Sequence, residues 1–170
     1  MVTSALNQLL HGVRWGNLDV LVVDFPPGTG DAHLTMAQRA PLTGAVIVST
    51  PQDIALQDAR KGVRMFEKVQ VPVFGLVENM SYFLCPHCRE RSEIFGHGGA
   101  RNEAEQTGTP FLGEIPLDIR IRETSDAGTP IVILDPESVQ SKAYLALADN
   151  VSRRIEEAHS ANVPTRIIVD

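Results

Sequence analysis

Short, almost continuously apolar runs alternate along the chain with segments whose apolar residues recur at helical spacing. The runs that predict strands buried on both faces are residues 18–24, 43–49, 71–77 and 111–115. The segments that predict helices run from 31 to about 40, from 50 to about 70, from 99 to 107 and from about 137 to 158. This alternation predicts an α/β fold: a doubly wound, mostly parallel sheet with helices on both faces.

The ends and faces of these helices also follow from local pattern. Thr50 is the predicted N-cap of the second helix, with Pro51 at its first position and Asp53 favouring its positive end, and Gly108 closes the third. The stripe expected on the second helix is Ile54, Val63, Phe66 and Val69. The last helix carries apolar residues at spacings typical of a helix covering a sheet, namely Tyr144, Leu147, Val151 and Ile155.

Composition narrows the class of protein. With 170 residues, 43% of them hydrophobic, the chain suits one domain and can bury a core. No apolar run approaches the roughly 18–20 residues of a membrane span, and the start does not resemble a signal peptide. Two cysteines make no disulfide framework, and a net charge of −6 argues against nucleic acid. We expect a cytoplasmic protein whose partners are neither nucleic acids nor membranes.

A carboxylate ends the first predicted strand, and a glycine-rich loop follows it. The string is DFPPGTGD, from Asp24 to Asp31. In phosphoryl-transfer enzymes an Asp in this place holds Mg²⁺ beside a phosphate-binding loop, and the Gly28 N–H can reach a γ-phosphate. The simpler alternative is an ordinary strand-end Asp followed by a Pro-Gly turn.

The same loop is not a Walker A loop. Asp31 and Ala32 stand where a lysine and a Ser or Thr are required. The chain has only three lysines, none of them after a glycine-rich loop: Lys61, Lys68 and Lys142. The sequence therefore has an Asp that could hold the Mg²⁺ of a nucleotide site, but not the Walker A loop that would bind the phosphates.

Taken in order, several strings resemble one family. They are LDVLVVDFPPGTGD, STPQDIALQDARKGVRMFEKVQVPVFGLVENMS, CPHC, IFG and GEIPLDIRIRETSDAGTPIV. They resemble the Mrp-type (ApbC-like) iron–sulfur cluster carriers, P-loop ATPases of the deviant Walker A class related to MinD and ParA. The resemblance covers about residues 5–155. It implies that residues 1–158 are the C-terminal portion of a single P-loop NTPase domain whose Walker A loop lies upstream, with 159–170 a loose tail.

The resemblance also implies where ATP and Mg²⁺ bind. Asn79, expected at the end of the third strand, has a side-chain amide that can hydrogen-bond the adenine edge. Pro116, Leu117 and Asp118 follow the fourth strand and could frame the base. Both segments border adenine in the family. The alternatives without a role in nucleotide binding are a turn at the end of a strand for Asn79 and core packing for Leu117.

Cys85 and Cys88 have a C-x-x-C spacing that can hold one metal centre from a turn. Neighbouring His87, Arg89 and Arg91 are expected to favour thiolates. One pair supplies two ligands, whereas a tetrahedral zinc or a four-iron cluster wants four, so a symmetric dimer could complete the set.

Other interpretations of the cysteines stay open. His87 and His97 could complete a zinc site within one chain. A thiol-redox motif or a purely structural pair is also possible. The family resemblance implies a 4Fe–4S cluster bridged between two subunits by Cys85 and Cys88, a homodimer through this region, and iron–sulfur apo-proteins as recipients.

The sequence thus predicts an ATP-dependent iron–sulfur cluster carrier. Without a P-loop lysine, this chain alone is expected to bind ATP very weakly and to hydrolyse none. The strand that should lie beside residues 18–24 is missing, so apolar sheet surface is expected to lie uncovered. The alternatives are a MinD- or ParA-like positioning switch without metal, and a zinc-stabilised binding module.

Overall fold

One sheet of four strands organises the molecule. The computed structural model describes residues 8, 12–25, 37, 40 and 42–161. The central strand β2 (Val73–Leu84) pairs in parallel with β1 (Ala45–Ser49) on one side and β4 (Phe111–Leu117) on the other. The two-residue strand β3 (Arg91–Ser92) pairs antiparallel with the far end of β2. The predicted mostly parallel sheet is confirmed.

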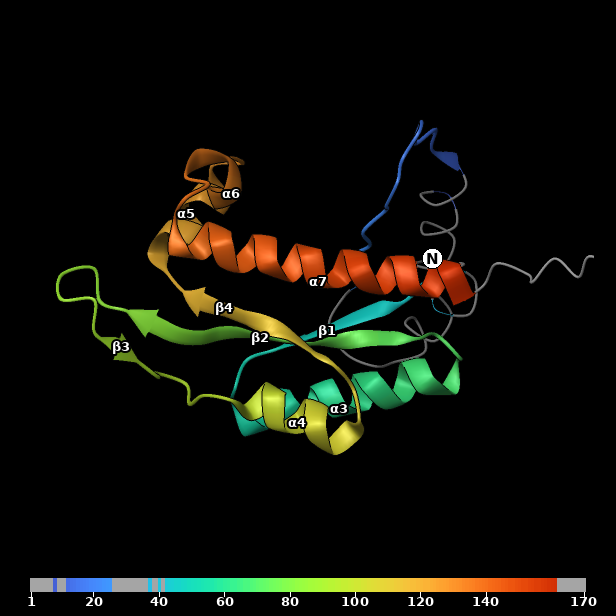
Figure 1. The fold of residues 1–170 in the computed structure, drawn as a ribbon, viewed down its shortest axis with the longest axis horizontal. Helices are drawn as coiled ribbons and strands as arrows, with labels where there is room; N and C mark the ends of the chain where they lie inside the picture. The colour runs from blue at the N-terminus through green and yellow to red at the C-terminus, as the bar shows by residue number, and fades with distance from the viewer. Residues whose placement is uncertain (1–7, 9–11, 26–36, 38–39, 41, 162–170) are drawn as a thin grey trace, which may run out of the picture.

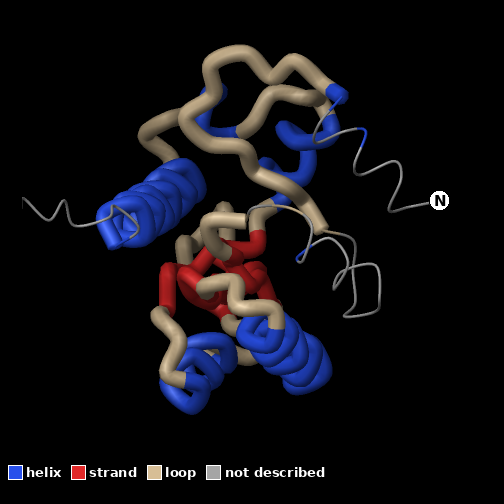
Figure 2. Tube along the Cα trace, turned by 90° about the vertical axis from the view of Figure 1, so that its right-hand side faces the viewer, coloured by secondary structure: helices blue, strands red, loops and turns tan. Residues whose placement is uncertain are grey.

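Helices cover both faces of this sheet, as predicted. Helices α3 (Asp53–Lys68) and α4 (Gly99–Thr107) lie on one face, and the long helix α7 (Val139–Ala161) lies on the other (Figures 1 and 2). The short helices α5 (Ile119–Asp126) and α6 (Ile131–Leu134) connect the end of β4 to α7.

Each face of the sheet has its own apolar core. On the α3 and α4 side, Val63 and Phe66 pack with Ile47 and Leu76 of the strands. On the α7 side, the buried strand residues are Val77, Leu112 and Ile115, and three of the four predicted α7 residues pack against them: Tyr144, Leu147 and Val151. The two faces of β1 and β2 are therefore both engaged, which explains their nearly continuous apolar sequence.

The predicted stripe of α3 was wrong at one position. Ile54 is 79% exposed, whereas Leu56, Ala59, Val63 and Phe66 are buried. At about 100° per residue, Ile54 lies roughly 180° around the helix from Val63, so the two cannot share a face. The buried residues Leu56, Ala59, Val63 and Phe66 have the spacing of a single helix face.

Helix ends also differ from the prediction in places. Thr50 is not the N-cap of α3: Gln52 takes that position, and the Thr50 hydroxyl donates to Gln52 Oε1 at 3.1 Å. Gly108 closes α4 with φ 66°, as its predicted role requires. Helix α7 continues to Ala161, three residues past its predicted end.

Residues 18–24 were predicted to form a buried strand, and this prediction was wrong. The segment has no regular structure and no place in the four-stranded sheet, and Val22 is 86% exposed. A strand needs a hydrogen-bonded neighbour, and no described strand pairs with this one. The predicted Gly28 loop, and the predicted helix 31–40 apart from Ala37 and Ala40, lie outside the described residues.

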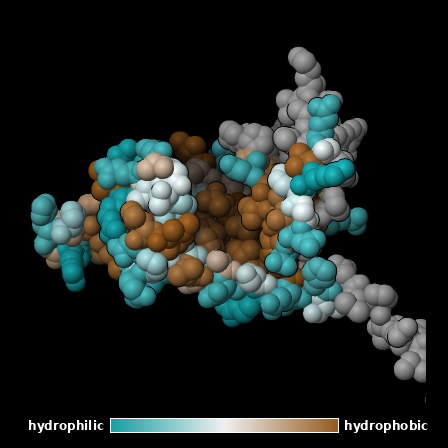
Figure 3. Space-filling view, turned by 90° about the horizontal axis from the view of Figure 1, so that it is seen from above, coloured by the Kyte–Doolittle hydropathy of each residue, from teal (hydrophilic) through white to brown (hydrophobic). Residues whose placement is uncertain are grey.

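Apolar side chains of the described residues are exposed on the α7 side. Viewed from that side, apolar side chains line a hollow in the molecule (Figure 3). Val48, on strand β1, is 59% exposed although its strand is part of the sheet. Among the described strands, β1 has a partner along one edge only.

Candidate metal and nucleotide sites

The two cysteines lie in the loop of a hairpin at the far end of β2. Phe83 and Leu84 at the end of β2 pair with β3. The loop that joins β2 to β3 projects from the sheet (Figure 1). The Cys85 N–H donates to the Glu90 carbonyl at 3.0 Å, and the Arg89 N–H donates to the Cys85 carbonyl at 2.8 Å. Both thiols are free, that of Cys85 half-buried and that of Cys88 exposed. The loop thus presents two sulfur atoms from one ordered turn.

The loop itself favours a thiolate at Cys85. Hydrogen bonds from the backbone N–H of Cys88, then from that of His87, and then from the Cys88 side chain lower the pKa of Cys85. The sequence predicted this direction but assigned it to neighbouring arginine and histidine charges. Arg91 is not among the groups that shift this pKa, and its guanidinium carbon lies 4.1 Å from the centre of the Tyr82 ring.

The described residues give no support to a zinc site that His87 and His97 complete within one chain. His97 lies beside Ser81 and Glu78, with Nδ1 3.0 Å from Ser81 Oγ and 3.5 Å from Glu78 Oε1. In the part of the chain that the structure describes, no group of three or more His, Cys, Asp or Glu side chains could hold a metal ion. Within the described ranges, the cysteine pair thus has no third ligand from its own chain.

The predicted adenine-side residues meet on neighbouring strands. Asn79 of β2 lies opposite Ile115 of β4, the residue before Pro116. Asn79 is half-buried, and its side-chain oxygen accepts from the Met80 N–H at 3.0 Å. Strand β2 does not end there as predicted, because it continues past a register irregularity to Leu84.

The remaining predicted site residues have structural partners or lie elsewhere. Asp118 is the N-cap of α5, accepting from the Arg120 N–H at 2.7 Å and from the Gln140 side-chain amide. Asp24 is exposed; the ring of Phe25 lies 5.9 Å from that of Phe66, near the last turn of α3 and the beginning of β2. The structure therefore brings Asn79 and Pro116 together but does not bring Asp24 to them. Gly28 lies outside the described residues.

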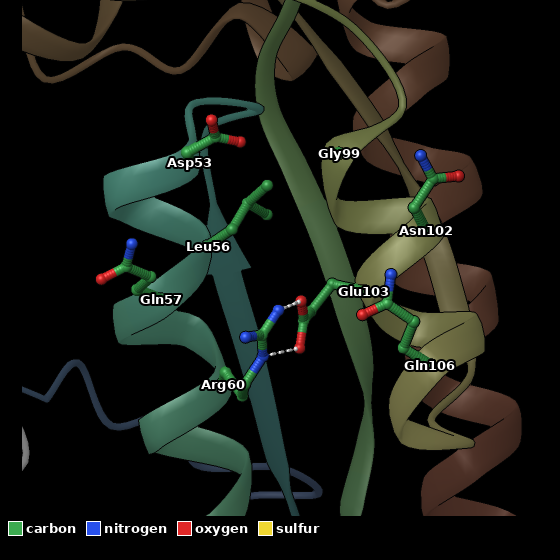
Figure 4. A pocket seen from close by; sticks show the side chains of 8 residues that line it. All are labelled: Asp53, Leu56, Gln57, Arg60, Gly99, Asn102, Glu103 and Gln106. Atoms are coloured by element: carbon green, nitrogen blue, oxygen red, sulfur yellow. Dashed lines mark hydrogen bonds and ion pairs between the residues drawn. The ribbon is translucent and has the colours of Figure 1, made fainter.

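A polar groove of about 370 Å³ separates α3 from α4 (Figure 4). In this groove the Arg60 guanidinium donates two hydrogen bonds to the buried Glu103 carboxylate, of 2.7 Å from Nε and 2.5 Å from Nη2. The hydrogen bond from Arg60 holds the pKa of Glu103 below its ordinary value. Asp53 lies at the mouth of the groove, in the first turn of α3, where its charge favours the helix N-terminus. Because Arg60 is already paired with Glu103, we interpret the groove as part of the contact between α3 and α4 and not as a ligand site.

Sequence reasoning missed a buried polar cluster beside the hairpin. Glu78 and Ser81 are fully buried on β2, and Glu114 lies opposite Glu78 on β4. The signal was present in the sequence, since Glu78 is the one charged residue in the apolar run VFGLVEN. A carboxylate in a strand buried on both faces requires donors nearby.

The fold first defines a class. A mostly parallel sheet covered on both faces is similar to P-loop NTPases of the MinD type. A nucleotide-binding protein of Archaeoglobus fulgidus, solved with ADP, matches with TM-score 0.70 and 42% identity over 81% of this chain and 55% of its own. MinD of Pyrococcus furiosus shares the fold at TM-score 0.65 and 24% identity, over 89% of this chain and 57% of its own.

The chain belongs to the ParA-type NUBPL/Mrp family of iron–sulfur cluster carrier P-loop NTPases. The family model described as "ParA: NUBPL iron-transfer P-loop NTPase" matches residues 1–152. The iron-sulfur cluster transfer protein NUBPL of Dictyostelium discoideum is 59% identical over 92% of this chain and 48% of its own length. The iron-sulfur cluster carrier protein of Escherichia coli K12 is 54% identical over 91% and 42%. This chain thus spans about half the length of the relatives it matches.

Among the described helices, none combines the length and apolar character that crossing a membrane requires.

Proposed function

We propose that this chain is the cluster-holding part of an ATP-dependent iron–sulfur cluster carrier. Its cargo is a 4Fe–4S cluster, which it passes to iron–sulfur apo-proteins. The observation that carries the proposal is the hairpin tip, where Cys85 and Cys88 present two free thiols from one turn. The lowered pKa of Cys85 supports it, because the thiolate is the form that ligates iron. Membership of the family and the names of the relatives point the same way.

The cluster lies between two copies of the chain in this proposal. Each chain contributes Cys85 and Cys88, so that a pair of copies supplies the four thiolates of a four-iron cluster. The hairpin supports such an arrangement because it projects from the body of the sheet (Figure 1). Among the described residues, each chain offers no third metal-binding side chain of its own.

The nucleotide binds along the edge formed by Asn79, Pro116 and Leu117, with Asp118 beside them. The register that places Asn79 opposite Ile115 supports this assignment. In a protein that also contains a P-loop lysine, Asp24 would hold Mg²⁺ and Gly28 would sense the γ-phosphate, which requires residues 18–24 to take a place beside the sheet that they do not have in this structure. We assign ATP hydrolysis to the protein that contains this lysine and not to the 170-residue chain alone. A reducing compartment such as the cytoplasm suits the two free thiols.

Anaerobic reconstitution with ferrous iron and sulfide tests the proposal. We expect the wild-type chain to gain a brown chromophore with four irons and four sulfides per two chains, and to become dimeric on size exclusion. Cys85→Ser and Cys88→Ser are each expected to lose both. Glu90→Gln is the matched control, because it removes a charged, exposed side chain from the same loop and leaves both thiols.

The outcomes separate the three functions considered. Zinc bound in place of iron by both cysteines would indicate a zinc-stabilised binding module. No bound metal under any condition would indicate a positioning switch of the MinD or ParA type. A chromophore that survives both serine substitutions would refute the assignment of the cysteines.

A further inference from the structure

Two carboxylates lie side by side in the sheet close to the cysteine hairpin. Glu78 of β2 and Glu114 of β4 are register partners in the parallel pair. The Glu78 side chain is 1% exposed and that of Glu114 is 24% exposed. Like charges opposite each other in a sheet repel, so this arrangement is stable only if donors surround both groups.

A bulge in β2 brings one of these donors to Glu78. Between Asn79 and Phe83, β2 advances four residues while β4 advances from Ile115 to Leu117, and Met80 has a φ of 55°. The bulge turns Ser81 towards Glu78, and its hydroxyl donates to Glu78 Oε1 at 2.6 Å. Strict alternation would have put residues three apart on opposite faces.

The loop that enters α4 supplies the next donors. The N–H groups of Gly98 and Ala100 donate to Glu78 at 2.9 and 2.8 Å, so this buried carboxylate closes the start of the helix. His97 Nδ1 lies 3.0 Å from Ser81 Oγ. The Ser81 hydroxyl also lies 3.1 Å from Glu114 Oε2, so Ser81 connects His97 with both carboxylates.

Arg91 connects this network to the hairpin. It lies in β3 opposite Leu84, the residue before Cys85. Its Nη2 is 3.4 Å from Glu114 Oε2 and 3.2 Å from the ring nitrogens of His97, while its guanidinium stacks on Tyr82. One side chain thus joins the returning strand of the hairpin to β2, to β4 and to the loop before α4.

The hairpin needs such an anchor. Its ladder consists of two residue pairs, Phe83 with Ser92 and Leu84 with Arg91. A two-stranded hairpin is marginally stable on its own. The turn that carries the cysteines extends beyond this ladder, so its position depends on what holds β3.

We propose that Arg91 is a positioning residue for the cysteine pair, anchored by Glu78, Ser81, His97 and Glu114. We call these five residues the anchor cluster. The cluster holds β3 against the body of the sheet, and with it the turn that presents Cys85 and Cys88. The part of the proposal that concerns cargo rests on the proposed function, whereas the part that concerns the hairpin does not.

Two variants separate this role from a general effect of charge near the thiols. Arg91→Ala removes the link to the cluster. Arg89→Ala is the matched control, because Arg89 is exposed and lies one residue from Cys88, and alanine keeps the Cβ that Arg89 already has at its φ of 61°. Glu114→Gln is a second test from the other side of the contact, and Arg91→Lys restores a cation without the planar fork.

Amide hydrogen exchange on the metal-free 170-residue chain tests the hairpin itself. We expect Arg91→Ala to speed exchange in residues 83–92 about tenfold, Glu114→Gln to speed it less, and Arg91→Lys to recover part of the loss. Exchange in α7 serves as the internal reference for global stability and should not change. Equal exchange in Arg91→Ala and Arg89→Ala would overturn the proposal.

Reconstitution with iron and sulfide then tests the consequence for cargo. Arg91→Ala should lose its cluster to a chelator about tenfold faster than wild type and Arg89→Ala. Its visible circular dichroism, which reports the surroundings of the bound cluster, should change as well. Identical loss rates and spectra would overturn the role in holding cargo. If the wild-type chain takes up no cluster, the proposed function fails, and hydrogen exchange alone decides whether Arg91 positions the hairpin.

Discussion

Replacement of the buried Glu78 by glutamine tests whether this carboxylate joins the sheet to α4. Its side chain, 1% exposed, accepts from the Ser81 hydroxyl and from the N–H groups of Gly98 and Ala100, at 2.6, 2.9 and 2.8 Å. Glutamine keeps one acceptor oxygen and places an NH₂ group against the N–H of Ala100, which is fully buried. An unsatisfied buried donor costs roughly 1–3 kcal/mol, and hydrogen bonds to a neutral acceptor are weaker than those to a charged one. We therefore expect Glu78→Gln to lower the free energy of unfolding by about 2–4 kcal/mol.

Urea unfolding followed by far-ultraviolet circular dichroism measures this change. Glu105→Gln is the matched control, because it makes the same substitution at an exposed position of α4, the helix that Glu78 closes. We expect it to change stability by less than about 0.5 kcal/mol. Hydrogen exchange at the first turn of α4 should rise in Glu78→Gln alone. If both variants have the same unfolding free energy, the carboxylate does not stabilise this junction and the reasoning is refuted.

Three further predictions follow from other parts of the molecule. Gly108→Ala should destabilise the chain by about 1–2 kcal/mol, because Gly108 has a φ of 66°, with open space around it. Gly62→Ala inside α3 should instead stabilise the chain by about 0.5–1 kcal/mol. Thermal unfolding of both variants shows whether the two changes have opposite signs. Because Arg60 lowers the pKa of Glu103 in the folded state, their pair contributes stability above the ordinary glutamate pKa and loses it as pH falls towards the folded value. The difference in unfolding free energy between wild type and Glu103→Gln should therefore shrink in acid, and a constant difference would contradict this assignment. Calorimetric titration of the 170-residue chain with ATP should give a dissociation constant weaker than micromolar, since the chain lacks a P-loop lysine; micromolar binding would contradict that expectation.

The candidate site was predictable where it depends on residue type and local position. Cys85 and Cys88 were expected in a turn after a strand, and the structure places them there. Asn79 and Pro116 were assigned to one site because both segments border adenine in the family that the sequence resembles, and the register places Asn79 opposite Ile115, the residue before Pro116. The causes of the Cys85 thiolate were not predictable, since they are backbone N–H groups whose direction depends on how the turn closes.

The anchor cluster shows why pairing across strands escaped the sequence. Glu78 is visible as an odd carboxylate in an apolar run, but its partners are 3, 19, 20, 22 and 36 residues away in the chain: Ser81, His97, Gly98, Ala100 and Glu114. The contact of Arg91 with Glu114 likewise depends on the register between β2 and β4 and on a bulge of β2. Nothing in the local pattern specifies that register.

The sequence by itself determined the alternation of strands and helices, the closing glycine of α4 and the apolar face of α7, because periodicity and capping act within a few residues of the chain. Only the tertiary structure decided which apolar runs become strands. Residues 18–24 are at least as apolar as residues 43–49, yet the latter pair with β2 while the former have no described strand neighbour and stay largely exposed. The physical reason is that a strand is stabilised by hydrogen bonds to another strand, so its formation depends on a partner that its own sequence does not contain.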